Sequence, residues 1–69
     1  MLKAERLQAI VDITNKEKIV TSEELMRQLN ISKATARRDI EELSSQGLIQ
    51  KTRGGAMSAN HASLEPSFV

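Results

Sequence analysis

The sequence predicts a mostly α-helical domain in which three helices are followed by a small β-hairpin. Three observations lead to this fold class: an amphipathic helical pattern near the start of the chain, two capping signals that open two further helices with a tight turn between them, and a glycine pair between two short strand-like segments. With 69 residues the chain has room for one small core, and a single Phe with no Trp or Tyr makes that core aliphatic.

The first helix is expected over about residues 2–14. Its inward-facing side chains recur at helical spacing at Leu7, Ile10, Val11 and Thr14. The polar residues 15–18 break this pattern, so we expect the helix to end before them. Residues 19–20, Ile and Val, are typical of a very short strand that could pair with a later one.

A second helix is expected over residues 22–29, because three local signals agree on its start. Thr21 offers a hydroxyl cap, and Glu24 three residues later completes a capping box. Val20, just before the cap, can pack against Leu25 as a hydrophobic staple.

A third helix is expected over about residues 33–46, after a connection of about three residues. Asn30 suits the left-handed turn after a helix end, and Ser32 is a second capping residue. The apolar stripe of this helix consists of Ala36, Ile40 and Leu43. Gly47 provides the stop.

Residues 48–58 are predicted to form a hairpin, the wing. Residues 48–53 are typical of a strand, Gly54-Gly55 of a two-residue turn, and residues 56–58 of the returning strand.

Composition argues against several classes of protein. The chain has no cysteine, which leaves no disulfide framework and no thiolate metal site. No apolar stretch approaches the about 20 residues of a membrane span, and no signal peptide opens the chain, so we expect a cytoplasmic protein without a membrane partner. His61 is the only histidine, and no Ser or Asp has a visible general base, so we expect no catalytic residue, metal or cofactor.

The second and third helices with the hairpin predict a winged helix-turn-helix, in which the third helix can lie in a DNA major groove about 12 Å wide. The formal net charge of +1 does not by itself indicate nucleic-acid binding, so the position of the charges must decide. With the apolar stripe turned inward, small and basic residues occupy the outer face over its first turns, namely Ala34, Thr35, Arg37 and Arg38. Small side chains allow approach to base edges, and their methyl groups can meet thymine.

An arginine fork matches guanine or a phosphate. Arg38 is the candidate for reading a base, and Arg37, nearer the flank, for holding a phosphate. Ser32 and Lys33 can hold phosphate too, because helix N-termini favour anions. The alternative is that the two arginines are solvated surface charges.

The wing carries basic residues of its own. Lys51 and Arg53 flank Gly54-Gly55, where they could meet the DNA backbone or a minor groove. An ordinary solvated hairpin is the alternative. Arg6 in the first helix is a further candidate for a phosphate contact, with an exposed helical arginine as the alternative.

The acidic residues of the third helix are expected to be structural or solvated. Asp39 lies near the buried edge, so we expect an ion pair with the second helix or the wing, for example with Arg27. Glu41 and Glu42 repel phosphate and favour contact with DNA over only the first two turns.

These residues together resemble a known family. The pattern Ser32-x-x-Thr35-x-Arg37-Arg38-Asp39-Ile40-x-x-Leu43, followed by Gly47 and Gly54-Gly55-Ala56, closely resembles the N-terminal DNA-binding domain of DeoR-family transcriptional repressors. Glu5-Arg6 extends the resemblance to the first helix, and residues 65–68 resemble the link to the family's second domain.

The resemblance implies the head of a repressor of carbohydrate or polyol catabolism that binds double-stranded operator DNA. DNA contacts would come from Ser32, Thr35, Arg37 and Arg38, with Lys51 and Arg53 in the wing. A sugar-phosphate effector would bind only a C-terminal domain absent from this chain, with residues 1–58 as the DNA-binding domain and residues 59–69 as the linker. The full-length protein is expected to be a homo-oligomer on repeated half-sites, and the isolated domain a monomer.

Two other classes of function remain as alternatives. A winged-helix module for protein interaction would present an exposed apolar patch in place of the small and basic face. A small enzyme would need an acid, base, nucleophile or metal cluster, which the sequence does not offer.

Overall fold

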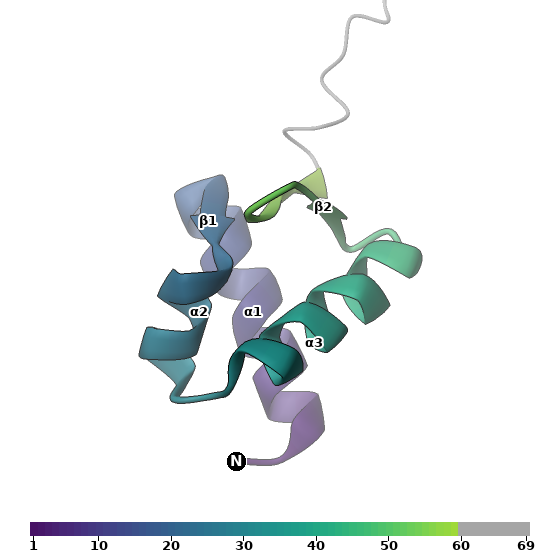
Figure 1. Ribbon diagram of the computed structural model, residues 1–69. Helices are drawn as coiled ribbons and strands as arrows, with labels where there is room; N and C mark the ends of the chain where they lie inside the picture. Colours follow the sequence, from purple (N-terminus) through teal and green to yellow (C-terminus); the bar gives the residue numbers. More distant parts are fainter. Residues whose placement is uncertain (60–69) are drawn as a thin grey trace, which may run out of the picture.

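The computed structural model describes residues 1–59 and has the predicted fold class (Figure 1). Three helices and a three-stranded antiparallel sheet make up this part of the chain. In chain order the elements are α1 (Lys3–Glu17), β1 (Ile19–Thr21), α2 (Ser22–Leu29), α3 (Lys33–Ser45), β2 (Ile49–Lys51) and β3 (Gly55–Ser58). This is a winged helix-turn-helix, with β2, β3 and their turn as the wing.

Helix α1 extends three residues beyond the predicted end at Thr14. Residues 15–17 are polar and exposed, and Lys and Glu are good helix formers, so the last turn needs no apolar partner. The helix ends at Glu17, and its C-cap residue Lys18 has a positive φ of 74° and donates its N–H to the carbonyl of Thr14 at 2.8 Å.

The caps of α2 and α3 are confirmed. The Thr21 hydroxyl accepts from the Glu24 N–H at 3.1 Å, and the Glu24 carboxylate accepts from the Thr21 N–H at 3.0 Å, which completes the capping box. Asn30 adopts the left-handed conformation with φ of 55°. The Ser32 hydroxyl then accepts from the Thr35 N–H at 3.1 Å and opens α3.

Helix α3 ends at Ser45, one residue earlier than predicted, with Gln46 as its cap. Gly47 follows with φ of 78°, a conformation that glycine adopts without strain. The Leu48 N–H turns back to the carbonyl of Leu43 at 3.0 Å, which aims the chain into the wing.

The core lies where the three helices meet the inner face of the sheet. It consists of the buried residues Ile10, Val20, Leu25, Ile40, Leu43, Ile49 and Ala56. The predicted inward stripe of α3 is confirmed, since Ala36 is buried together with Ile40 and Leu43. Val20 and Leu25 share this core, and Leu29 is half-buried against it.

The sheet has the order β1-β3-β2, so the last strand in sequence is the central one. Ile19 is opposite Met57 in the first pair of strands, and Ile49 is opposite Ser58 in the second. The predicted pairing of the short strand after α1 is therefore confirmed.

The prediction that Gly54 and Gly55 form the two-residue turn is wrong by one position. Gly55 is the first residue of β3, and its carbonyl accepts from the Thr52 N–H at 3.0 Å, so Arg53 and Gly54 form the turn. The reason is close packing: a Cβ on Gly55 would lie 2.1 Å from the Val20 carbonyl oxygen. The predicted first strand also contracts, from residues 48–53 to β2.

The predicted linker and His61 fall almost wholly outside the described residues, of which Ala59 is the last. The division of the chain at residue 58 thus stays a prediction. Within residues 1–59, no helix is long and apolar enough to cross a membrane.

Candidate nucleic-acid interface

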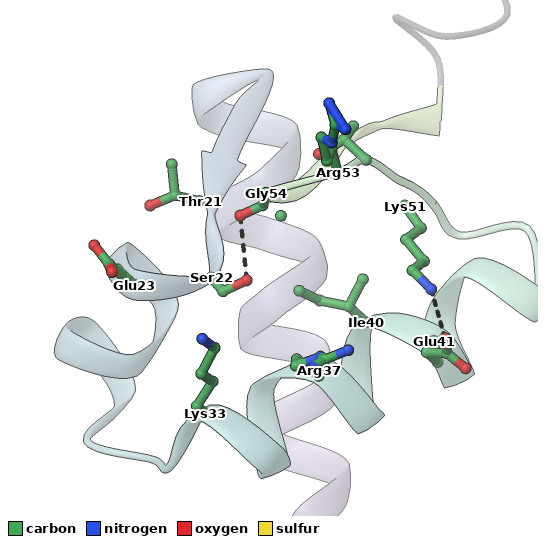
Figure 2. Close-up of a pocket in the computed structure, with 12 residues that line it drawn as sticks. Thr21, Ser22, Glu23, Lys33, Arg37, Ile40, Glu41, Lys51, Arg53 and Gly54 are labelled. Carbon is green, nitrogen blue, oxygen red and sulfur yellow. Dashed lines mark hydrogen bonds and ion pairs between the residues drawn. The ribbon is translucent and has the colours of Figure 1, made fainter.

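A groove runs between the start of α2, the flank of α3 that carries Arg37, and the wing (Figure 2). Its lining residues come from all three elements: Thr21, Ser22 and Glu23 at the start of α2, Lys33, Arg37, Ile40 and Glu41 on α3, and residues 51–55 on the wing. Four cationic and two anionic side chains line it, a formal charge of +2 in a chain whose total is +1. The groove is therefore the place where the chain concentrates positive charge.

The basic residues at the start of α3 are exposed and unpaired. Lys33 and Arg37 line the groove, and Arg38 lies beside it on the outer face of the helix. Within the described part of the chain none of the three forms an ion pair. Ala34 between them is exposed and small, so the outer face offers free charge without bulk.

The first turn of α3 presents backbone donors to the same side. The Ser32 hydroxyl caps the helix and also donates to the Thr35 hydroxyl at 3.1 Å. The next amides, of Lys33 and Ala34, belong to the first turn, where a helix offers its N–H groups no internal partner. This helix start can therefore hold an anion next to the groove.

The wing is held against α2 by its main chain. The Ser22 N–H donates to the Gly54 carbonyl at 2.9 Å, and the Ser22 hydroxyl donates to the same oxygen at 3.2 Å. Gly55 approaches the backbone of Val20 so closely that no side chain fits there. Arg53 at the tip is exposed and lines the groove.

The second wing cation, Lys51, is paired. Its Nζ lies 2.5 Å from Oε2 of Glu41, which stands on α3 one turn after Arg37. The hydrogen bond from Lys51 lowers the pKa of the Glu41 carboxyl, with smaller contributions from the charges of Lys51 and Arg37. Glu41 is exposed as predicted, but it belongs to an ion pair inside the groove.

Asp39 is buried, and its predicted partner was wrong. Its carboxylate accepts from Nε of Arg6 at 2.5 Å and from Nη2 at 3.1 Å, whereas Arg27 is exposed. The two residues are 33 positions apart and meet because α1 packs against α3. Hydrogen bonding to Asp39 raises the pKa of the Arg6 guanidinium.

This ion pair changes the interpretation of Arg6. Its side chain is largely buried, does not line the groove, and gives two donors to Asp39. Arg6 thus supports α3 from the side of α1. A phosphate contact by Arg6 stays a prediction that the geometry does not favour.

Some residues of the groove were not singled out from the sequence. Thr21 and Ser22 were recognised only as the start of α2, and Thr52 only as part of a strand. The signal that could have identified them is their position in the sequence, next to the predicted helix-turn-helix and within the basic wing. In residues 1–59, no three side chains of His, Cys, Asp or Glu come together as a metal site would require.

Comparisons with known proteins agree with the helix-turn-helix fold. The family model described as the DeoR-like helix-turn-helix domain matches residues 6–62. The chain is 36% identical over 69 residues to FruR, an uncharacterised helix-turn-helix-type transcriptional regulator of Bacillus subtilis (strain 168). It is 47% identical over 55 residues to the L-fucose operon activator of Escherichia coli (strain K12), and 41% over 58 residues to the lactose phosphotransferase system repressor of Staphylococcus aureus (strain NCTC 8325 / PS 47).

The matches cover most of this chain but a small share of the relatives. They include 100%, 80% and 84% of the chain and 28%, 23% and 23% of the three regulators, in the order given above. The chain thus spans about a quarter of the length of the curated relatives it matches. No solved structure gives a significant match.

Proposed function

We propose that this chain, which belongs to the family of DeoR-like helix-turn-helix domains, docks α3 into the major groove of operator DNA and lays the wing along the backbone or in a minor groove. Family membership makes the chain a DNA-binding domain of a transcription regulator. The docking mode is our proposal, and one observation carries it. Lys33 and Arg37, two groove cations that form no ion pair within residues 1–59, lie at the start of α3 beside an outer face of small residues.

The start of α3 supplies the proposed sequence-reading contacts. Arg38, on the outer face of α3, contacts a base edge in the DNA major groove, and the methyl groups of Ala34 and Thr35 contact bases in the same major groove. Arg37 and Lys33 hold the backbone from the flank, together with the amides that follow the Ser32 cap. Glu42 forms an ion pair with Lys3 of α1 at 3.1 Å, so we place Glu42 outside the proposed contact with DNA.

The wing supplies the proposed sequence-independent contacts. Arg53 and Lys51 reach phosphates from the far side of the groove, with Gly54 and Gly55 allowing close approach of the backbone. We do not include Arg6 in this surface, because Asp39 engages its guanidinium.

We further propose that the parent regulator controls carbohydrate use as a repressor with a sugar-phosphate effector. The support comes from two relatives, an L-fucose operon activator and a lactose phosphotransferase system repressor. Such an effector would bind the remaining three quarters of the regulator. A full-length homo-oligomer would place two heads on repeated half-sites, because one short helix reads too few base pairs.

The first test is a titration of the 69-residue chain with two duplexes, one of random sequence and one taken from upstream of its own operon. Amide chemical shifts are followed at several salt concentrations for wild type and Arg38→Ala. We expect shifts at residues 32–38 and 51–55 that weaken with salt. Arg38→Ala should cost about 1–3 kcal/mol on the operon duplex and little on the random one.

Two outcomes would count against the proposal. Equal losses on both duplexes would make Arg38 a phosphate contact instead of a base reader. No binding to either duplex at low salt would favour the protein-interaction module over the DNA-binding head.

A further inference from the structure

One of the two acidic side chains that line the groove, Glu41, lies among its cations. Glu41 is held between two cations, Lys51 of the wing at 2.5 Å and Arg37 one helical turn before it. Figure 2 shows Arg37 extending along α3 in the direction of the Lys51–Glu41 pair. All three line the groove and are exposed, so this arrangement is not needed to fill the core.

A carboxylate that is bonded to a lysine near an arginine uses the same cations that a phosphate would use. Phosphate and carboxylate oxygens accept from the same donors, so the two groups compete for them. The Coulomb attraction that Lys51 and Arg37 exert on Glu41 is the attraction they would exert on a backbone phosphate.

We propose that Glu41 is an internal competitor of the DNA backbone: in the free protein it holds Lys51 beside Arg37, and a phosphate must displace it before the wing can bind. This inference rests on the proposed DNA-binding function. Glu41 thereby weakens the binding of the groove to duplexes of any sequence and reduces the number of phosphates that the chain neutralises.

The neighbouring Glu42 offers a matched control. It is the next residue of α3, carries the same charge, and bonds Lys3 of α1 at 3.1 Å away from the groove. Glu41→Gln and Glu42→Gln both raise the net charge from +1 to +2. A difference between the two variants therefore reports on position and not on total charge.

The experiment measures the binding of the 69-residue chain to a duplex of random sequence, by fluorescence anisotropy from about 50 to 200 mM salt. We expect Glu41→Gln to bind about two- to fivefold more tightly than wild type at the low end, the range of exposed ion pairs. The slope of log K against log salt should steepen by about 0.9, one additional phosphate contact, and Glu42→Gln should change neither quantity as much.

A double-variant cycle tests the mechanism. Adding Glu41→Gln to Lys51→Gln should give a smaller gain, because the cation that Glu41 holds is already gone. Glu41 and Lys51 are exposed and Glu42 is partly exposed, so thermal melts should confirm that every variant folds.

Three results would overturn the inference. If Glu42→Gln tightened DNA binding as much as Glu41→Gln, the net charge alone would explain the effect. If Glu41→Gln gave the same gain in affinity in the Lys51→Gln background, Glu41 would not act through Lys51. If wild type and all variants fail to bind the random duplex at low salt, the proposed function fails together with the inference.

Discussion

The start of α3 and the wing both bring cations to one groove, but they are held in different ways. The backbone of α3 is fixed by its buried stripe and by the ion pair of Asp39 with Arg6, while its own cations form no ion pair within residues 1–59. The wing is fixed by hydrogen bonds from Ser22 and by close packing at Gly55, and one of its two cations is tied to Glu41.

In α3, the residues that position the helix are therefore different from the residues that carry its positive charge. The residues that orient α3 point inward or toward α1, so its outward side chains can serve contact alone. In the wing the residues that hold the hairpin, Gly54 and Gly55, directly follow the cation Arg53, and the cation Lys51 bonds α3 through Glu41. Substitutions on the outer face of α3 should therefore change binding with little change in folding, whereas substitutions in the wing should often change both.

The largest expected effect comes from removing the support of α3. Leu43→Ala should cost about 2–5 kcal/mol of unfolding free energy, because it leaves a cavity under the helix. A domain of this size is expected to have only about 3–5 kcal/mol in total, so the variant should be close to unfolded. Urea or thermal unfolding measures this. Leu48→Ala is the control, since Leu48 is 45% exposed, and a comparable loss there would disprove the inward face assigned to α3.

A smaller effect is expected from the support of the wing. Gly55→Ala would place a Cβ 2.1 Å from the Val20 oxygen and 2.7 Å from Thr21 Cα, both backbone atoms that cannot simply rotate away. We expect a loss of about 1–3 kcal/mol, with amide shift changes concentrated in β1 and β3. Gly54→Ala is the matched control, because nothing lies within 4 Å of its Cβ and its φ is not left-handed. Equal stabilities of the two variants would contradict the close packing at Gly55.

The smallest expected effect concerns the Lys51–Glu41 ion pair, which distinguishes the paired cation of the wing from the cations of α3. The Lys51 hydrogen bond lowers the pKa of Glu41, so the pair stabilises the folded chain above the ordinary glutamate pKa, and this contribution is lost as the pH falls through the lowered value. An NMR titration of the Glu41 carboxyl carbon should therefore show a midpoint below that of an ordinary glutamate. In Lys51→Gln the midpoint should move upward. An unchanged midpoint would mean that the ion pair does not persist in solution.

Much of the fold could be predicted because its signals are local. The capping box of Thr21 and Glu24, the left-handed Asn30 and the Ser32 cap each depend on a few neighbouring residues. The inward stripe of α3 follows from periodicity alone. These features also fix the helix-turn-helix geometry, so the location of the candidate interface followed with them.

The misses involve contacts between distant parts of the chain. Nothing near Asp39 in the sequence indicates that Arg6 is its partner, because their meeting depends on how α1 crosses α3. The role of Gly55 depends on the backbone of Val20, which reaches it only through the sheet. The ion pair of Lys51 with Glu41 likewise requires the wing to fold back on α3.

The strand order has a consequence for how the protein forms as it is synthesised. Because β3 lies between β1 and β2, neither of the earlier strands has a sheet partner among residues 1–54. On the ribosome the three helices can pack together first, whereas β1 and β2 can pair with β3 only after residues 55–58 have left the exit tunnel. The sheet then closes a loop of more than thirty residues between β1 and β3, a non-local step that is slow relative to helix formation. Until Gly55 has left the tunnel, the emerged chain can form α3 but not the wing.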